Sequence, residues 1–250
     1  MHVGRIAMAA ASTAASSPPP ATLTVIGFGS LMSETSSRGS FPDLRNFRYA
    51  RVKGFRRVMR HSPHLFVERG IANMDTLEMA SLCAEPCDAA KGYEGGFVAC
   101  AFDVDQPSEE EMAAFRAREE EFDLVEAEFT ELSDEGLVGK GLLCAASTDE
   151  KYVELWGQDV FDQKYTANGL KTIWGWAPDS GLRPCPVYLR HCVLATEKVG
   201  EVRPDVRDSF LDETFLADRT TTIRQYLASE AGAHVMDTRP PPSLVGRYSG

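Results

Sequence analysis

One glutamate in the chain stands where a carboxylate can act as a general base. In PSEEEMAAFRAREEEFDL (residues 107–124), spacings of three, four and three residues place four positions on one helix face: Met112, Phe115, Glu119 and Phe122. At about 100° per residue, Glu119 lies within roughly 20° of the centre of this apolar stripe. Partial desolvation raises the pKa of a carboxylate toward the range in which a base works well. Glu119 is therefore a candidate general base; alternatively, it lies at the edge of the core and pairs with an arginine.

A glycine-bearing loop is the second candidate feature. In TVIGFGSLMSE (residues 24–34), an apolar run ends at Gly27 and Gly29, which flank Phe28. A dinucleotide fingerprint would need a third glycine where Met32 stands, and it would open a helix. The following TSSRGSFPD has no helical period and indicates a loop. The segment is thus not expected to bind a dinucleotide, and its two remaining interpretations are an anion-binding loop and a simple turn after a strand.

The elements that must position these residues follow from hydrophobic periodicity. Alternating or β-branched runs predict strands at 23–29, on both sides of Gly54 in 47–62, and at 79–86, 95–104, 126–134 and 136–147. Ser108 and Glu111 form a capping box that begins a helix running to about Phe122. Helical patterns follow at 149–166 and 206–227, and residues 185–195 fit either a strand or a helix. Short strands first and helices later indicate an α+β fold.

Composition and charge exclude several classes of function. The chain has 250 residues, a formal charge of −11 and 43% hydrophobic residues, which suits a globular domain with a sizeable core. Without a stripe of Lys and Arg, binding to nucleic acid or to an anionic membrane is disfavoured, and no apolar run reaches the ~18 residues of a membrane span. The six cysteines include no CxxC pair, which indicates no zinc site and free thiols in a reducing compartment.

The two ends of the chain are predicted to be unstructured. Residues 1–22 are rich in Ala, Ser and Pro and contain no acid, so they are expected to be a disordered tail. A cytoplasmic location follows unless this segment is an organelle transit peptide. The expected organisation is then a core over 23–146, a mainly helical extension packed on it over 147–230, and a flexible tail over 231–250.

Three motifs in order resemble the γ-glutamylcyclotransferase-like superfamily, which includes ChaC and AIG2-like proteins. They are Phe28-Gly29-Ser30-Leu31 after the first strand, the segment Val52-Lys53-Gly54-Phe55-Arg56-Arg57, and Arg118-Glu119 followed by Phe122. The resemblance covers residues 24–130. It implies a small mixed or antiparallel β-barrel flanked by helices, here with a helical C-terminal extension.

The resemblance also implies a reaction. The loop from Phe28 to Leu31 would bind a small γ-glutamyl substrate through its backbone N–H groups, and Glu119 would act as general acid and base. Attack of the α-amine on the γ-carbonyl of the same molecule would release 5-oxoproline and an amine, an amino acid or a peptide, with glutathione among the possible substrates. No metal or cofactor is implied, and the chain is expected to act as a monomer or homodimer.

The sequence departs from the family pattern at positions that bear on the substrate. Phe28 and Phe122 stand where tyrosine is common, and Glu120 and Glu121 replace glycines. The two glutamates point more than ~100° away from the apolar stripe and are expected to face water at the pocket rim. There they would weaken the binding of an acidic substrate. The alternative function is a catalytically idle, AIG2-like module that binds a γ-glutamyl-like ligand or a protein partner.

Overall fold

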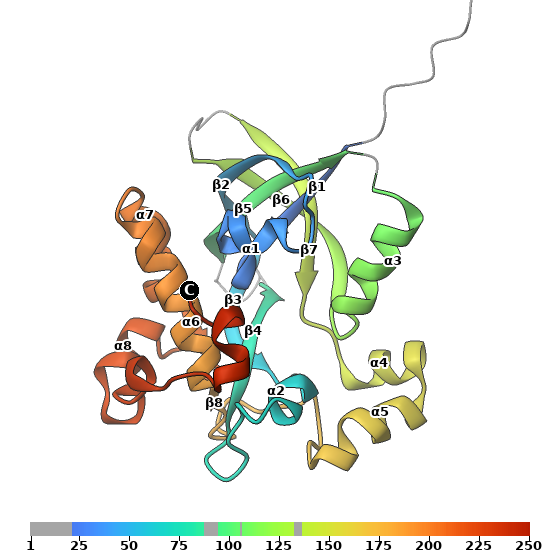
Figure 1. The fold of residues 1–250 in the computed structure, drawn as a ribbon, viewed down its shortest axis with the longest axis vertical. Coiled ribbons are helices and arrows are strands. Elements are labelled where there is room, and N and C mark those ends of the chain that lie inside the picture. The colour runs from blue at the N-terminus through green and yellow to red at the C-terminus, as the bar shows by residue number, and fades with distance from the viewer. Residues whose placement is uncertain (1–21, 88–94, 106, 133–136) are drawn as a thin grey trace, which may run out of the picture.

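The predicted strands close into a five-stranded barrel (Figure 1). A computed structural model describes residues 22–87, 95–105, 107–132 and 137–250. In barrel order the strands are β1 (Thr22–Gly27), β5 (Gly96–Asp105), β2 (Arg45–Lys53), β6 (Asp123–Glu131) and β7 (Val138–Ala145). Neighbours are antiparallel except β1 and β7, which close the ring in parallel. The predicted α+β fold with a small mixed barrel flanked by helices is confirmed.

Further strands extend the sheet away from the barrel. β4 (Glu78–Pro86) joins β7 through the single pair Ala84 and Ala145 and lies antiparallel to β3 (Phe55–His61). Two short parallel strands complete the sheet: β8 (Arg183–Pro184) beside β4 and β9 (Thr214–Leu216) beside β3. The barrel and this extension meet at the carboxyl end of β1, where the glycine-bearing loop begins.

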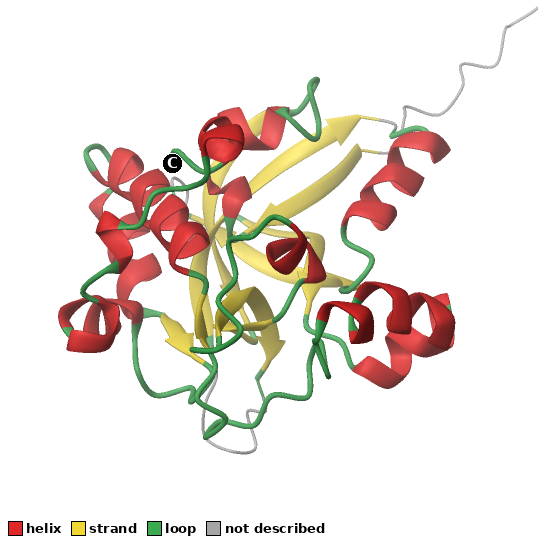
Figure 2. Ribbon diagram, turned by 60° about the horizontal axis from the view of Figure 1, so that its bottom comes forward, coloured by secondary structure: helices red, strands yellow, loops and turns green. Residues whose placement is uncertain are grey.

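Helices lie on both sides of the strands (Figure 2). The first three are α1 (Glu34–Arg38), α2 (His64–Glu68) and α3 (Glu109–Arg118), and the later ones are α4 (Asp149–Trp156), α5 (Gln158–Lys164), α6 (Pro186–Gly200), α7 (Pro204–Asp212) and α8 (Ile223–Ala228). The region after residue 146 is mainly helical, as predicted, although β8 and β9 join the sheet. None of the helices in the described ranges is long and apolar enough to cross a membrane.

Local signals in the sequence account for most element boundaries. β2 and β3 flank Gly54, which has φ +77°, and Ser108 and Glu111 make both hydrogen bonds of the capping box at the start of α3. Residues 149–166, which have a helical pattern, form two helices, because Gly157, with φ +90°, separates α4 from α5. Residues 185–195, compatible with strand or helix, form part of α6, which starts at Pro186, a residue favoured in a first helical turn.

The C-terminal residues pack on the protein, in contrast to the predicted flexible tail. A 3₁₀ helix at Pro242–Arg247 leads to Tyr248, which is 4% exposed and accepts a hydrogen bond from Arg69 at 3.0 Å. The backbone N–H of Gly250 donates to Nδ1 of His191 at 2.9 Å, and burial lowers the pKa of this histidine to about 4. These contacts hold the C-terminal segment against α6. At the other end, all but Thr22 of the predicted N-terminal tail lies outside the described residues.

Candidate functional site

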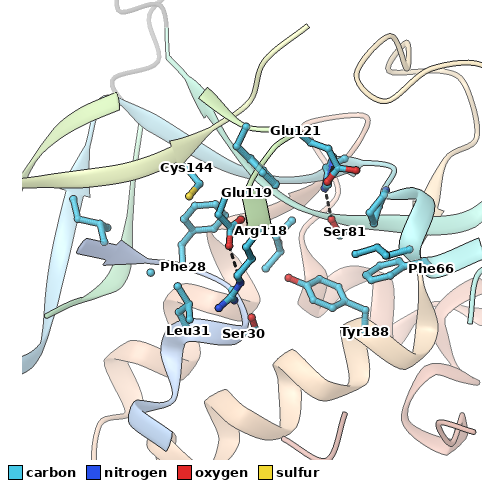
Figure 3. Close-up of a pocket in the computed structure, with 18 of the residues that line it drawn as sticks. Phe28, Ser30, Leu31, Phe66, Ser81, Arg118, Glu119, Glu121, Cys144 and Tyr188 are labelled. Atoms are coloured by element: carbon cyan, nitrogen blue, oxygen red, sulfur yellow. Dashed lines mark hydrogen bonds and ion pairs between the residues drawn. The ribbon is translucent and has the colours of Figure 1, made fainter. Parts of the chain in front are cut away.

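The loop after β1 and the turn after α3 line the same cavity, of about 190 Å³ (Figure 3). The loop contributes residues 27 to 31, so all the predicted substrate-binding residues (Phe28, Gly29, Ser30 and Leu31) are present. The turn contributes Glu119, the predicted base. Further lining comes from β3, α2, β4, β7, α6 and the C-terminal segment, as His61, Phe66, Ser81, Leu82, Cys144, Tyr188 and Arg247. The structure therefore brings together every residue that the sequence selected for the site.

Glu119 is a mostly buried carboxylate that faces the loop. Its side chain is 16% exposed, and Oε1 lies 3.0 Å from Nε of Arg118, which is more exposed. Burial raises the pKa of Glu119, and the neighbouring charge of Glu121 raises it further, whereas Arg118 and His61 act in the opposite direction. A position at the edge of the core with an arginine partner, the alternative to a general base, is thus observed together with the raised pKa. A proton can reside on this carboxylate at a higher pH than on an exposed glutamate.

The helix that carries Glu119 is shorter than predicted. α3 ends at Arg118, and Glu119 caps it with φ −104° and ψ 30°. Beyond this point the helical stripe no longer applies, so the prediction that Glu120 and Glu121 face water is wrong. Glu121 is 8% exposed and accepts a hydrogen bond from the hydroxyl of Tyr165, while Glu120 pairs with Lys164.

A buried arginine beneath the loop fixes its orientation. Arg57 donates hydrogen bonds to the carbonyls of Phe28 (3.3 Å), Val98 (3.1 Å) and Ser209 (3.0 Å), and to the hydroxyl of Thr214 (2.6 Å). In a trans peptide the C=O and the next N–H point in opposite directions. Because the Phe28 carbonyl points at Arg57, the N–H of Gly29 points away from it. Arg57, the last residue of the second motif, is thus an interior residue with its donors directed to these acceptors.

Two further carbonyls, at the end of the loop, are also occupied. The carbonyl of Leu31 accepts hydrogen bonds from Ser37 at 2.7 Å and from the Cys100 thiol at 3.0 Å. The carbonyl of Met32 accepts one from the Tyr49 hydroxyl at 3.3 Å. These bonds anchor the loop to the protein interior. A loop held in this way keeps its N–H groups in place without rearrangement when a ligand arrives.

Gly27 is required by the close packing behind the loop. A Cβ at this position would lie 2.6 Å from Cβ of Leu31 and 2.9 Å from Sγ of Cys100. We expect Gly27→Ala to lower the free energy of unfolding by about 1–3 kcal/mol, because overpacking forces neighbouring groups to shift. Urea denaturation would measure this loss. Gly246→Ala is the matched control, since a Cβ there meets no atom within 4 Å; equal stability of both variants would contradict the tight packing.

Several lining residues escaped the sequence analysis. Tyr188 lies on α6 with its hydroxyl 2.9 Å from where a Cβ of Gly29 would be. Arg247 comes from the C-terminal segment, and Ser81 from the centre of β4. His61 comes from the end of β3. No local pattern singles out these side chains, because the residues beside them in the sequence pack in the hydrophobic core.

Beyond the cavity lies a second groove with a cationic lining. It has a volume of about 500 Å³ and shares Ser30, Phe66, Arg118, Tyr188 and Arg247 with the cavity. Arg69 and His191 add to its wall. Three of the lining residues are arginines and none is acidic, in a chain whose formal charge is −11. The groove is therefore a local concentration of positive charge beside Glu119 and the loop.

Comparison with known proteins gives matches to solved structures alone. No family model and no curated protein sequence matches the chain. The fold is similar to that of an uncharacterized Homo sapiens protein, with 10% identity over 50% of this chain and 67% of the other and a TM-score of 0.35. It is similar to a gamma-glutamyl cyclotransferase, with 9% identity over 50% and 68% of the two chains and a TM-score of 0.34. An Arabidopsis thaliana protein matches with 15% identity over 57% and 87% of the two chains and a TM-score of 0.33.

At these TM-scores and identities the matches carry no information about the reaction. The functional conclusion has to come from the cavity, its carboxylate and its loop. The solved structures to which this chain is similar do include a member of the family that its three ordered motifs resemble.

Proposed function

We propose that the protein is a γ-glutamylcyclotransferase that releases 5-oxoproline from γ-glutamyl amino acids or peptides. The observation that carries this proposal is the shared cavity of Glu119 and the loop from Phe28 to Leu31. A carboxylate of raised pKa and a fixed set of backbone N–H donors are the two groups that an intramolecular acyl transfer needs. The cavity of about 190 Å³ suits a small acyl group rather than a large ligand.

In this reaction two protons leave the α-ammonium of the substrate. A bond forms between the α-nitrogen and the γ-carbonyl carbon, and the bond from that carbon to the leaving nitrogen breaks. Glu119 takes a proton from the α-ammonium of the substrate, and the freed amine attacks the γ-carbonyl of the same molecule. The N–H of Gly29, which points away from Arg57, is the candidate donor to the oxygen that becomes negative. As the tetrahedral intermediate collapses, the bond to the leaving nitrogen breaks and Glu119 gives that nitrogen the proton it took. The ring nitrogen loses its second proton to the Glu119 carboxylate, which passes it to the freed amine, so the products are 5-oxoproline and an ammonium group. Because attack is intramolecular, the site needs only to hold the ring-closing conformer.

The test is release of 5-oxoproline from a panel of γ-glutamyl compounds. Purified protein is incubated with γ-glutamyl-alanine, glutathione and γ-glutamyl-ε-lysine, and the products are separated by mass spectrometry. Turnover of at least one substrate with stoichiometric 5-oxoproline is the expected result. A folded protein that binds these compounds in calorimetry but turns over none of them would instead be a binding module of the AIG2-like kind.

The arginines at the mouth of the cavity favour a leaving group with a carboxylate. Glu120, expected at the rim, instead pairs with Lys164, so its charge is offset and does not oppose an acidic substrate. Arg118 and Arg247 line both the cavity and the groove beside it. A charge-assisted hydrogen bond contributes about 1.5–3 kcal/mol. We therefore expect amino acids and peptides to be better leaving groups than uncharged amines.

Replacing Arg247 by glutamine tests this preference. The expected result is a rise of about 10- to 100-fold in KM for γ-glutamyl-alanine. The KM for γ-glutamyl-ethylamide, whose leaving amine has no carboxylate, is expected to stay the same. Arg239→Gln is the control, since Arg239 is exposed and lies outside the cavity lining. An equal change in KM for both substrates in Arg247→Gln would mean that the arginine shapes the cavity but does not bind the carboxylate of the leaving group.

A further inference from the structure

A serine, a histidine and a glutamate form a connected chain on the wall of the same cavity. The hydroxyl of Ser81 lies 2.7 Å from Nδ1 of His61, and Nε2 of His61 lies 3.1 Å from Oε2 of Glu121. All three residues line the cavity, and Figure 3 labels Ser81 and Glu121 on the same side of it. The reaction through Glu119 uses none of them. The sequence contains no local Ser-His-acid motif at these positions.

The imidazole of His61 is held rigidly in this chain. It stacks on Trp174 with a centroid distance of 4.6 Å and an interplanar angle of 25°, and Phe122 packs against it at 4.6 Å. The same tryptophan donates its Nε1–H to the backbone carbonyl of Glu121 at 3.1 Å. The indole of Trp174 and the segment that carries the Glu121 carboxylate are thereby fixed relative to each other. The ring cannot turn without disturbing this packing, so its two nitrogens keep their separate partners.

The protonation pattern follows from the carboxylate. Burial alone would raise the pKa of Glu121, but His61 and the Tyr165 hydroxyl together lower it, so the group is ionised. Nε2 of His61 lies 3.1 Å from this carboxylate but outside hydrogen-bond geometry, so the contact is electrostatic. An ionised carboxylate at this distance favours the tautomer of a neutral His61 that carries its proton on Nε2. Nδ1 is then a lone pair, and the hydroxyl of Ser81 donates to it. This is the arrangement in which a base can remove a serine proton.

The thiol in the cavity, that of Cys144, lacks this support. Burial raises the pKa of the Cys144 thiol well above its ordinary value, with the charge of Glu119 adding to the effect, so the thiol stays protonated at neutral pH. The neighbouring histidine, His64, has carboxylates for partners: Glu68 at 2.8 Å and Glu120 at 3.8 Å. Among the described residues of the cavity, Ser81 is therefore the hydroxyl with a base and an orienting acid behind it.

We propose that Ser81 is a nucleophile for acyl transfer, with His61 as its general base and Glu121 holding the imidazole. The substrate class is a small ester or amide whose acyl group fits the cavity. As Oγ of Ser81 bonds to the acyl carbon, its proton passes to Nδ1 of His61. The bond to the leaving oxygen or nitrogen breaks, that atom takes the proton, and an ester remains on Ser81. Water then attacks the ester, losing a proton to His61, and Ser81 recovers it as the acid leaves.

The order of the ring nitrogens differs from that of the common serine hydrolases. There Nε2 faces the serine and Nδ1 faces the acid, whereas here Nδ1 faces Ser81 and Nε2 faces Glu121. In neutral imidazole either nitrogen can be the base while the other donates, so the chemistry is unchanged. The activity is independent of γ-glutamyl cyclisation, since it uses a different nucleophile and a different base.

The test uses p-nitrophenyl acetate, which reports acylation directly. The full chain is expected to release a burst of p-nitrophenol and to carry an acetyl group on Ser81, located by peptide mass spectrometry. Ser81→Ala should abolish both, and His61→Gln should slow the burst by about 10²- to 10⁴-fold, the usual contribution of a general base. Ser62→Ala is the matched control, since its buried hydroxyl has no hydrogen-bond partner among the described residues.

Three results would overturn the proposal. The first is a folded wild-type chain, by circular dichroism, with no burst and no acetyl group on Ser81. The second is acetylation of Ser81 at the same rate in His61→Gln, which would make the serine reactive without the histidine. The third is loss of 5-oxoproline release in Ser81→Ala without any acetylation of the wild type, which would make Ser81 a positioning residue for the Glu119 reaction.

Discussion

Replacing Glu119 by glutamine is expected to lower kcat for 5-oxoproline release by about 10²- to 10⁴-fold. Glutamine keeps the size of the side chain but can neither take the proton of the α-ammonium nor return one to the leaving nitrogen. The backbone N–H groups of the loop and the arginines at the mouth remain, so KM should change little. Product formation followed by mass spectrometry under saturating substrate measures the loss. A change of less than ten-fold would remove Glu119 from the chemical step.

The same variant is expected to remain folded. The pKa of Glu119 is raised in the folded state, so this group favours folding below its unfolded pKa, and that contribution is lost as pH rises through the folded value. At neutral pH the neutral glutamine therefore avoids a desolvation cost that the carboxylate bears. A melting temperature equal to or above that of the wild type is expected from differential scanning fluorimetry. A fall in melting temperature together with lost activity would attribute the loss of activity to destabilisation of the fold and not to the missing carboxylate.

The acid limb of the pH profile should report the same group. Glu119 must be deprotonated to act as base, so kcat/KM is expected to fall as pH drops through its raised pKa, above the ordinary value of about 4.3 for glutamate. Arg118 lowers this pKa, so Arg118→Met should move the limb to higher pH. Initial rates of 5-oxoproline release between acid and neutral pH give both curves. A limb at the same pH in both proteins would assign it to another group.

Replacing Arg57 by methionine is expected to lower the free energy of unfolding by about 3 kcal/mol or more. Arg57 is fully buried, with its guanidinium 4.9 Å from the ring of Phe97 and 5.0 Å from that of Phe210. Its removal takes a donor from three carbonyls and one hydroxyl in the interior. The carbonyl of Ser209 keeps the N–H of Glu213 as a donor, but each buried group left unpaired costs about 1–3 kcal/mol. Burial lowers the pKa of Arg57 to about 10, so the guanidinium is still charged at neutral pH.

The neighbouring arginine provides a matched control. Arg56 lies on the same strand but faces the other side of the sheet, half-buried and 5.9 Å from the ring of Phe215. Arg56→Met is expected to cost less than Arg57→Met, because Arg56 is partly exposed and water can solvate the groups that its removal leaves. Urea denaturation gives both values. Equal losses in the two variants would show that the hydrogen bonds of Arg57 do not hold the loop.

Local patterns in the sequence singled out the loop and the candidate base. Gly27 and Gly29 mark the end of an apolar strand, and Glu119 interrupts an apolar stripe, so both were visible within windows of about ten residues. The strand breaks at Gly54 and the capping box at Ser108 were equally local. Such signals depend on backbone conformations and short-range hydrogen bonds that the chain makes with itself. They predicted the barrel strands, the loop from Phe28 to Leu31 and the position of Glu119 beside it.

Tertiary structure alone decided which other side chains reach the cavity. Ser81, His61 and Glu121 come from β4, the end of β3 and the turn after α3, and they meet because strand pairing and the early end of α3 bring them together. Helical periodicity placed Glu121 in water, whereas the chain leaves the helix at Arg118 and turns this side chain inward. Arg57 was likewise indistinguishable from its neighbour Arg56 until the sheet assigned them opposite faces. Periodicity records only which side of its own element a residue occupies; burial, partners and cavities depend on contacts between elements far apart in the sequence.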